Sequence, residues 1–135
     1  MITIRDVAPR DGLQSEQPVA PARRAAIAIA LADAGVGHVE AVSFVSPKAV
    51  PSMAGADEVV AALPRRVGVT WWALVPNAKG AELALAAGID HLTVTISASE
   101  GYSQKNVGRS TDDAISGLSQ IAEVAPGAGF DVVIS

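Results

Sequence analysis

An arginine and an aspartate stand side by side at Arg10 and Asp11, in a segment where Pro9 and Gly12 favour a turn. Carboxylate oxygens are the ligands that hard divalent cations prefer, and a guanidinium fork matches a carbonyl or carboxylate substrate. The pair could therefore serve metal-assisted chemistry on an oxygen-rich substrate. A surface ion pair in a loop explains the same two residues equally well.

Glu40 is a second candidate because it lies inside the apolar run of residues 39–44. Carboxylates are rarely buried without a partner, so an inward Glu40 needs a cation. Arg10, at the end of the neighbouring strand, is the natural one. The alternative places Glu40 outward, between helices. The segment 43–48 that follows is polar enough to line a pocket.

The elements that must position these residues alternate along the chain, with short β-rich runs between alanine-rich helical stretches. This order is typical of a parallel sheet with crossover helices. The predicted strands cover residues 2–8, 39–44, 67–75, 91–97 and 130–134. The predicted helices cover residues 23–34, 56–63 and 78–87, with a fourth from residue 110 or 111 after a long polar loop.

About four βα units followed by a fifth strand fit either half of a (β/α)₈ barrel or a small open doubly wound sheet. The chain has neither G-x-G-x-x-G after the first strand nor a G-x-x-x-x-G-K-[ST] loop, the fingerprints that would favour the open sheet. In both folds the ligand site lies at the carboxyl ends of the strands. Polar residues there form a candidate substrate-facing rim: Asn77, Lys79, Ser97, Ser99, Glu100, Lys105 and Asn106.

His38 and His91 stand at strand beginnings, on the face that serves stability, and neither is predicted to bind a metal. Trp71 and Trp72 are adjacent in one strand and must point to opposite faces of the sheet. One is therefore predicted to lie in the interior and the other against helices.

Composition narrows the function classes. The 135 residues carry a net charge of -4 and half of them are apolar, which indicates one domain and disfavours nucleic acid and anionic membranes as partners. The chain has no cysteine, which excludes a disulfide scaffold, a thiolate metal site and a cysteine nucleophile within these residues. Without a signal-like start or an apolar stretch of roughly 20 residues, a cytoplasmic protein is expected.

Taken in order, these motifs resemble the hydroxymethylglutaryl-CoA lyases, within the wider group of metal-dependent barrel lyases and Claisen-condensing synthases. The resemblance covers essentially the whole chain. It rests on Asp6-Val7-Ala8-Pro9-Arg10-Asp11-Gly12-Leu13-Gln14, Glu40, Ser43-Phe44-Val45-Ser46-Pro47-Lys48, Pro76-Asn77, Lys79-Gly80, Ala98-Ser99-Glu100 and Lys105-Asn106.

The resemblance implies an α/β fold in which residues 1–135 form the N-terminal half of a (β/α)₈ TIM barrel. It also implies a divalent cation, Mg²⁺ or Mn²⁺, and cleavage of a 3-hydroxyacyl-CoA to acetyl-CoA and a keto acid. By the same resemblance Asp11 is a metal ligand, Arg10 and Glu40 are catalytic, and Gln14 and Ser43 bind substrate.

The family's histidine metal ligands belong to strands seven and eight, which lie outside these residues. The chain alone is therefore expected to be inactive, and to form a homo-oligomer or pair with a complementary half-barrel. Open edges and an inner face expected to be rich in Val, Ile, Ala and Trp point the same way. The fifth strand has no arginine where relatives often carry one, so which acyl-CoA is bound stays open. A fragment of a condensing synthase and a non-catalytic half-barrel are the alternatives.

Overall fold

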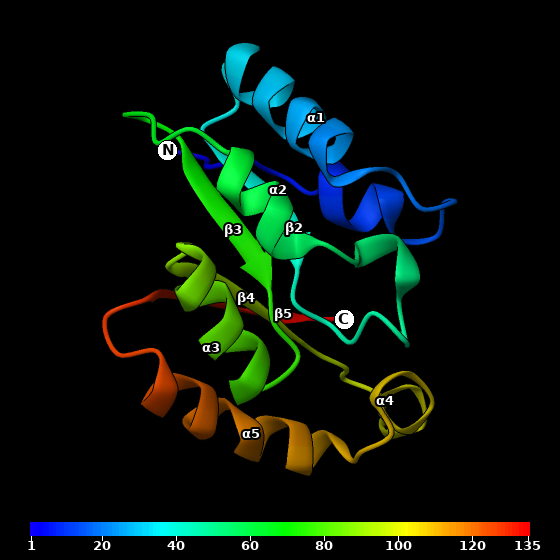
Figure 1. The fold of residues 1–135 in the computed structure, drawn as a ribbon. Coiled ribbons are helices and arrows are strands. Elements are labelled where there is room, and N and C mark those ends of the chain that lie inside the picture. The colour runs from blue at the N-terminus through cyan, green and yellow to red at the C-terminus, as the bar shows by residue number, and fades with distance from the viewer.

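The computed structural model describes residues 1–135 and contains a five-stranded, wholly parallel sheet in the order β1-β2-β3-β4-β5 (Figure 1). The strands are β1 (Arg5–Asp6), β2 (His38–Ser43), β3 (Thr70–Leu74), β4 (His91–Ile96) and β5 (Gly129–Ile134). Each strand pairs with the one before it and the order never reverses. A doubly wound sheet would reverse, so the sheet is half of a TIM barrel, as the sequence resemblance predicts.

The helices lie along the outside of this sheet, and α1, α2, α3 and α5 follow one another in an arc (Figure 1). The α-helices are α1 (Pro21–Asp33), α2 (Ala56–Ala62), α3 (Ala78–Ala87), α4 (Glu100–Val107) and α5 (Thr111–Val124). Two shorter turns are η1 (Ala8–Gly12), a single turn of π-helix, and η2 (Pro51–Met53), a 3₁₀ turn. None of the helices is both long and apolar enough to cross a membrane.

The hydrophobic core fills the space between the sheet and the helices. One set of strand side chains, including Val39, Val42, Ala73, Leu92 and Val94, is buried there against small residues of the helices. Alanine dominates the helical side, with Ala25, Ala28, Ala81 and Ala84 in the core, which lets the helices approach the sheet closely. Trp71 packs against this core, as predicted for one of the two tryptophans.

The other face of the sheet is concave and largely polar, so the expectation of an inner face rich in Val, Ile and Ala is wrong. Cross-strand partners share a face, and the register pairs Glu40 with Trp72 and Thr93 with Asp131. Trp72 lies on this face below the guanidinium of Arg5, whose central carbon is 4.2 Å from the ring centroid. The strands appear apolar in sequence because their other face is the core.

Two predicted elements differ from the structure. The first strand was expected over residues 2–8, but only Arg5–Asp6 is paired, because residues 1–4 meet no neighbouring strand and Pro9 cannot donate to a ladder. The expected polar loop after β4 contains helix α4. Ser99 caps its first turn by accepting a hydrogen bond from the Tyr102 amide (3.4 Å), and Gly108 ends it at φ 68°.

Candidate active site

Arg10 and Glu40 form a buried ion pair at the mouth of the half-barrel. The turn η1 follows β1 at once and brings Arg10 over the carboxyl end of the sheet, while Glu40 rises from β2 on the concave face. Arg10 Nε donates to Glu40 Oε1 at 2.6 Å, and their side chains are 13% and 2% exposed. Glu40 therefore faces inward to Arg10, and the outward alternative is wrong.

Asp11 lies on the solvent side of the same guanidinium. Arg10 Nη1 donates to Asp11 Oδ1 at 2.8 Å, yet the aspartate side chain is 62% exposed. The same nitrogen is 3.4 Å from Gln14 Oε1. The Arg10 guanidinium is thus held by Glu40 on its buried side and by Asp11 on its solvent side. The second carboxylate oxygen of Asp11 has no protein partner. This arrangement leaves Arg10 Nη2 and one carboxylate oxygen at the opening of the barrel.

Ser43 is the last residue of β2 and lies next to Leu74 in the register. It is 1% exposed, and its Oγ has no hydrogen-bond partner. A buried hydroxyl without a partner costs free energy, so such groups in native proteins call for an explanation such as a ligand. Ser43 is therefore suited to bind a polar group that enters the mouth.

Two side chains that the sequence did not single out hold these loops in place. Ser52 Oγ donates to the Gln14 carbonyl at 2.5 Å, which ties the loop after β2 to the turn after β1. Arg24 on α1 is fully buried and its Nη1 donates to the Ala54 carbonyl at 2.7 Å. Burial lowers the pKa of Arg24, and no carboxylate pairs with it. An arginine in an alanine-rich helix gives no sign of burial in the sequence, so the role of Arg24 was missed. Ser52 was missed as well.

A hollow of about 460 Å³ adjoins this site at the carboxyl ends of β3 and β4. Gln14 forms part of its wall, together with residues of the loop after β2, the start of α3, and helices α4 and α5. The predicted rim is thus partly assembled. Asn77 and Asn106 line the hollow, whereas Lys79 pairs with Glu82 at 3.2 Å on the outside of α3, and Glu100 joins α4 to α5.

The two histidines lie away from the mouth, as their positions at strand beginnings predict. His38 Nδ1 accepts a hydrogen bond from Trp72 Nε1 at 3.2 Å, and the His91 ring lies 5.0 Å from the Trp72 ring. Nowhere do three His, Asp or Glu side chains gather as they would around a metal ion. Among the predicted site residues, Asp11 alone offers an exposed carboxylate at the mouth.

Comparison with known proteins shows the family to which this fold belongs. A family model described as HMGL-like matches residues 1–135. The chain is 43% identical over 125 residues to the 3-hydroxy-3-isohexenylglutaryl-CoA/hydroxy-methylglutaryl-CoA lyase of Pseudomonas aeruginosa, covering 92% of this chain and 42% of that protein. The crystal structure of the hydroxymethylglutaryl-CoA lyase from Pseudomonas aeruginosa superposes with a TM-score of 0.93 at 40% identity, covering 98% of this chain and 45% of that one.

A further solved structure, an HMG-CoA lyase from Acinetobacter baumannii in complex with coenzyme A and 3-methylmalate, gives a TM-score of 0.93 at 30% identity. It is matched over 99% of this chain and 45% of its own length. The chain therefore spans less than half the length of the relatives that it matches.

Proposed function

This chain belongs to the HMGL-like family, and from that premise we propose that it forms the N-terminal half of a barrel lyase that cleaves a carbon–carbon bond in a 3-hydroxyacyl-CoA. The observation that carries the proposal is the Arg10–Glu40 ion pair at 2.6 Å with Asp11 beside it, at the carboxyl end of a half-barrel. Active sites of TIM barrels lie at this end. The relatives named above are lyases that act on acyl-CoA substrates by their names, which supports cleavage as the reaction.

Arg10 acts on the charge that develops during cleavage. Breaking the bond leaves the electron pair on the departing acetyl thioester as an enolate, whose oxygen becomes negative. A fixed guanidinium stabilises such an oxygen without having to reorient. Glu40 fixes Arg10 through Nε, and Nη2 remains free to donate toward the mouth. The buried Glu40 is thus a positioning residue for Arg10.

Ser43 and Gln14 are proposed to bind the substrate. The Ser43 hydroxyl is buried, unpartnered and on the concave face, and can hydrogen-bond a substrate oxygen. Gln14 is braced through its backbone by Ser52, and its side chain borders both Arg10 and the hollow. Both residues therefore offer a hydrogen-bonding group near the Arg10 site.

A divalent cation, Mg²⁺ or Mn²⁺, would polarise the substrate hydroxyl and carbonyl oxygens when bound. Within these residues Asp11 fits such a cation, because one of its carboxylate oxygens has no protein partner. One carboxylate does not complete a coordination shell, since dedicated sites use several protein ligands plus water. The remaining ligands are proposed to come from a complementary half-barrel.

A chimera tests the proposal directly. Residues 1–135 replace the matching part of the Pseudomonas aeruginosa lyase, and cleavage of hydroxymethylglutaryl-CoA is measured with Mg²⁺ or Mn²⁺. We expect turnover, and we expect Arg10→Gln to abolish most of it. Arg23→Gln, which removes an exposed arginine of α1, is the matched control. A folded chimera that binds the cation but cleaves no acyl-CoA would contradict the proposal.

A further inference from the structure

The hollow beside the candidate active site has an unusual charge. The chain contains 14 acidic and 10 basic residues, yet no carboxylate lines this hollow. Of the 20 lining residues, Arg109 is the one that carries a charge. A low-dielectric wall focuses the field of a single cation into such a cavity. The hollow is therefore electropositive in a protein whose net charge is negative.

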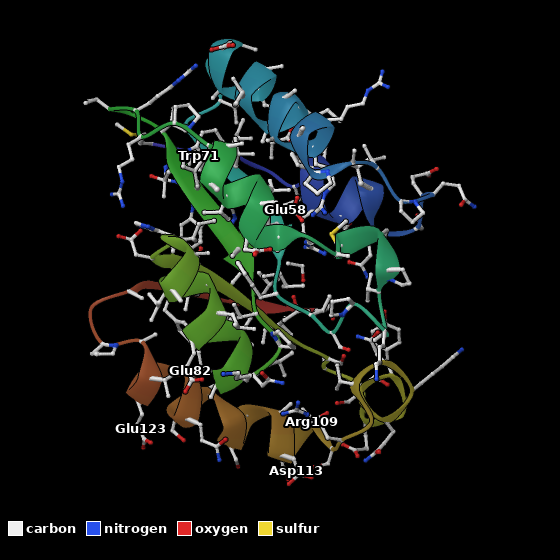
Figure 2. The ribbon with its side chains drawn as sticks, viewed as in Figure 1. Glu58, Trp71, Glu82, Arg109, Asp113 and Glu123 are labelled. Carbon is white, nitrogen blue, oxygen red and sulfur yellow. The ribbon has the colours of Figure 1, made fainter.

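Arg109 has no partner for its guanidinium. The residue is partly buried just before α5, and it forms no ion pair and no side-chain hydrogen bond. Its backbone is nevertheless fixed, because Ser103 Oγ donates to the Arg109 carbonyl at 2.9 Å. Figure 2 shows Arg109 beside α5, with Asp113 on the opposite side of that helix. A guanidinium has five N–H donors, and here all of them lack a protein acceptor.

Gly117 lies beside this guanidinium and lines the hollow on the side of α5. A Cβ built at Gly117 would lie 3.6 Å from Arg109 Nη1, an ordinary van der Waals contact, so alanine would fit there and only a larger side chain would fill the space beside Arg109.

The amides of the hollow also offer donors. Asn77 Oδ1 is engaged as the cap of α3, where it accepts from the Gly80 amide at 3.0 Å. Gln14 Oε1 faces Arg10 Nη1. With both carbonyl oxygens engaged, each side chain has its NH₂ group left to bind a ligand. The hollow thus combines a free cation with amide donors and suits an electron-rich ligand.

We propose that the hollow binds a phosphate group through Arg109, and that this phosphate belongs to the coenzyme A part of the substrate. The choice of coenzyme A rests on the proposed function. Gln14 borders both the Arg10 site and the hollow, so one extended ligand can reach from the reacting carbon to Arg109. The volume of about 460 Å³ exceeds the needs of a free phosphate ion. Binding energy gained at such a remote anchor can be used to position the reacting end.

The test is isothermal titration calorimetry on the 135-residue chain at low ionic strength, with coenzyme A, pantetheine and inorganic phosphate as separate ligands. Arg109→Gln should weaken coenzyme A binding about tenfold or more, since one charge-assisted hydrogen-bonding group is lost. Pantetheine, which has no phosphate, should bind the wild type and Arg109→Gln equally. Added salt should weaken binding of coenzyme A and leave that of pantetheine unchanged.

Two further variants test whether the effect of Arg109→Gln depends on the space beside Arg109 and on the position of the removed charge. Gly117→Leu keeps Arg109 but fills the space beside it, so it should also weaken coenzyme A binding. Arg65→Gln is the matched control, because Arg65 is an exposed arginine that lines a separate hollow at the opposite end of the sheet. That variant should bind coenzyme A like the wild type.

The outcomes distinguish this inference from the proposed function. Equal coenzyme A affinity in the wild type and Arg109→Gln would overturn the phosphate site and leave the lyase proposal intact. Binding of inorganic phosphate that depends on Arg109, without binding of coenzyme A, would support the phosphate site and count against an acyl-CoA as its source. A wild-type chain that binds neither ligand would overturn the inference.

Discussion

Arg5 of β1 and Asp131 of β5 connect the two edge strands of the sheet across its concave face, with 3.1 Å between Nη2 and Oδ2. On the way Arg5 Nη1 donates to Thr93 Oγ1 at 3.1 Å, and the guanidinium lies over Trp72. A single side chain therefore spans the half-barrel below the Arg10 site. No other ion pair or side-chain hydrogen bond joins β1 to β5, so Arg5 is the polar link across the curved sheet.

Removing Arg5 should destabilise the chain more than removing the charge of Asp131. Arg5→Met loses an ion pair, a hydrogen bond and a cation–π contact, which together amount to roughly 2 kcal/mol. Asp131→Asn should cost about 1 kcal/mol or less, because the carboxylate is half exposed and the ion pair is screened by solvent. Urea unfolding followed by tryptophan fluorescence measures both. A larger loss for Asp131→Asn than for Arg5→Met would contradict this ranking.

The Arg10–Glu40 pair should show strong coupling. Each single replacement, Arg10→Met or Glu40→Met, leaves a buried charge without its partner and should cost roughly 3 kcal/mol. The double variant should lose less than the sum of the two, because no uncompensated charge remains. A double-mutant cycle of unfolding free energies gives the coupling energy. Additive losses would show that the two side chains do not interact in solution.

In the chimera with the Pseudomonas aeruginosa lyase, replacing Asp11 should lower cation affinity, whereas replacing Arg10 should lower kcat. Asp11→Asn should weaken Mg²⁺ or Mn²⁺ binding at least about tenfold, because a charged ligand becomes neutral. Arg10→Gln should retain the cation and lower kcat by about a hundredfold, as expected when one stabilising donor is lost. Calorimetry with the cation and steady-state kinetics separate the two roles. Equal cation affinity in Asp11→Asn and the wild type would remove Asp11 from the site.

The 135-residue chain alone should show no appreciable lyase activity and should self-associate. Asp11 is the one metal ligand predicted within these residues, and the strand β5 leaves Val132, Val133 and Ile134 exposed at an open edge. Light scattering and a cleavage assay at saturating Mg²⁺ test both parts. Ile134→Lys should reduce association, whereas Val67→Lys, at an exposed site away from β5, should not. A stable monomer with ordinary turnover would contradict the expectation.

The junction between α4 and α5 should loosen in acid. The Thr111 amide donates to Glu100 Oε2 at 2.9 Å, and this hydrogen bond, with a second from Gln104, lowers the pKa of Glu100. A carboxylate with a lowered pKa in the folded state stabilises that state above its ordinary pKa, and the contribution is lost as pH falls through the lowered value. Relative to the intrinsic exchange rate at each pH, the protection of the Thr111 amide should therefore fall at acidic pH. In Glu100→Gln that protection should be lower already at neutral pH and should not change as the pH falls.

The Arg10–Glu40 pair was predictable because burial of a carboxylate in an apolar run admits few solutions, and one arginine stood at the adjacent strand end. The sequential order of βα units was likewise visible in the alternation of elements. Helix α4 could have been found from Ser99 and Gly108, which mark its ends, but its polar composition resembles a loop.

The polar character of the concave face is visible in β4, where His91, Thr93 and Thr95 alternate with apolar residues, but in β2 it depends on register. The pairing of β2 with β3 shifts between Glu40 and Val42, so the residues that share a face change along the strand. Arg24 and Arg109 were missed for a related reason. One is buried and the other lines a hollow only because distant segments meet there, and nothing in the neighbouring residues marks either position.

The strand order also bears on how the chain folds during synthesis. Because each strand pairs with the preceding one, every new βα unit that leaves the ribosome meets an edge already in place, and most of the sheet can grow by local contacts. Arg5 is the exception, since its partner Asp131 lies in the fifth strand and follows the other four in the sequence. The guanidinium of the first strand therefore has no ion-pair partner until four βα units have been made, and the curvature of these five strands is completed only when β5 emerges.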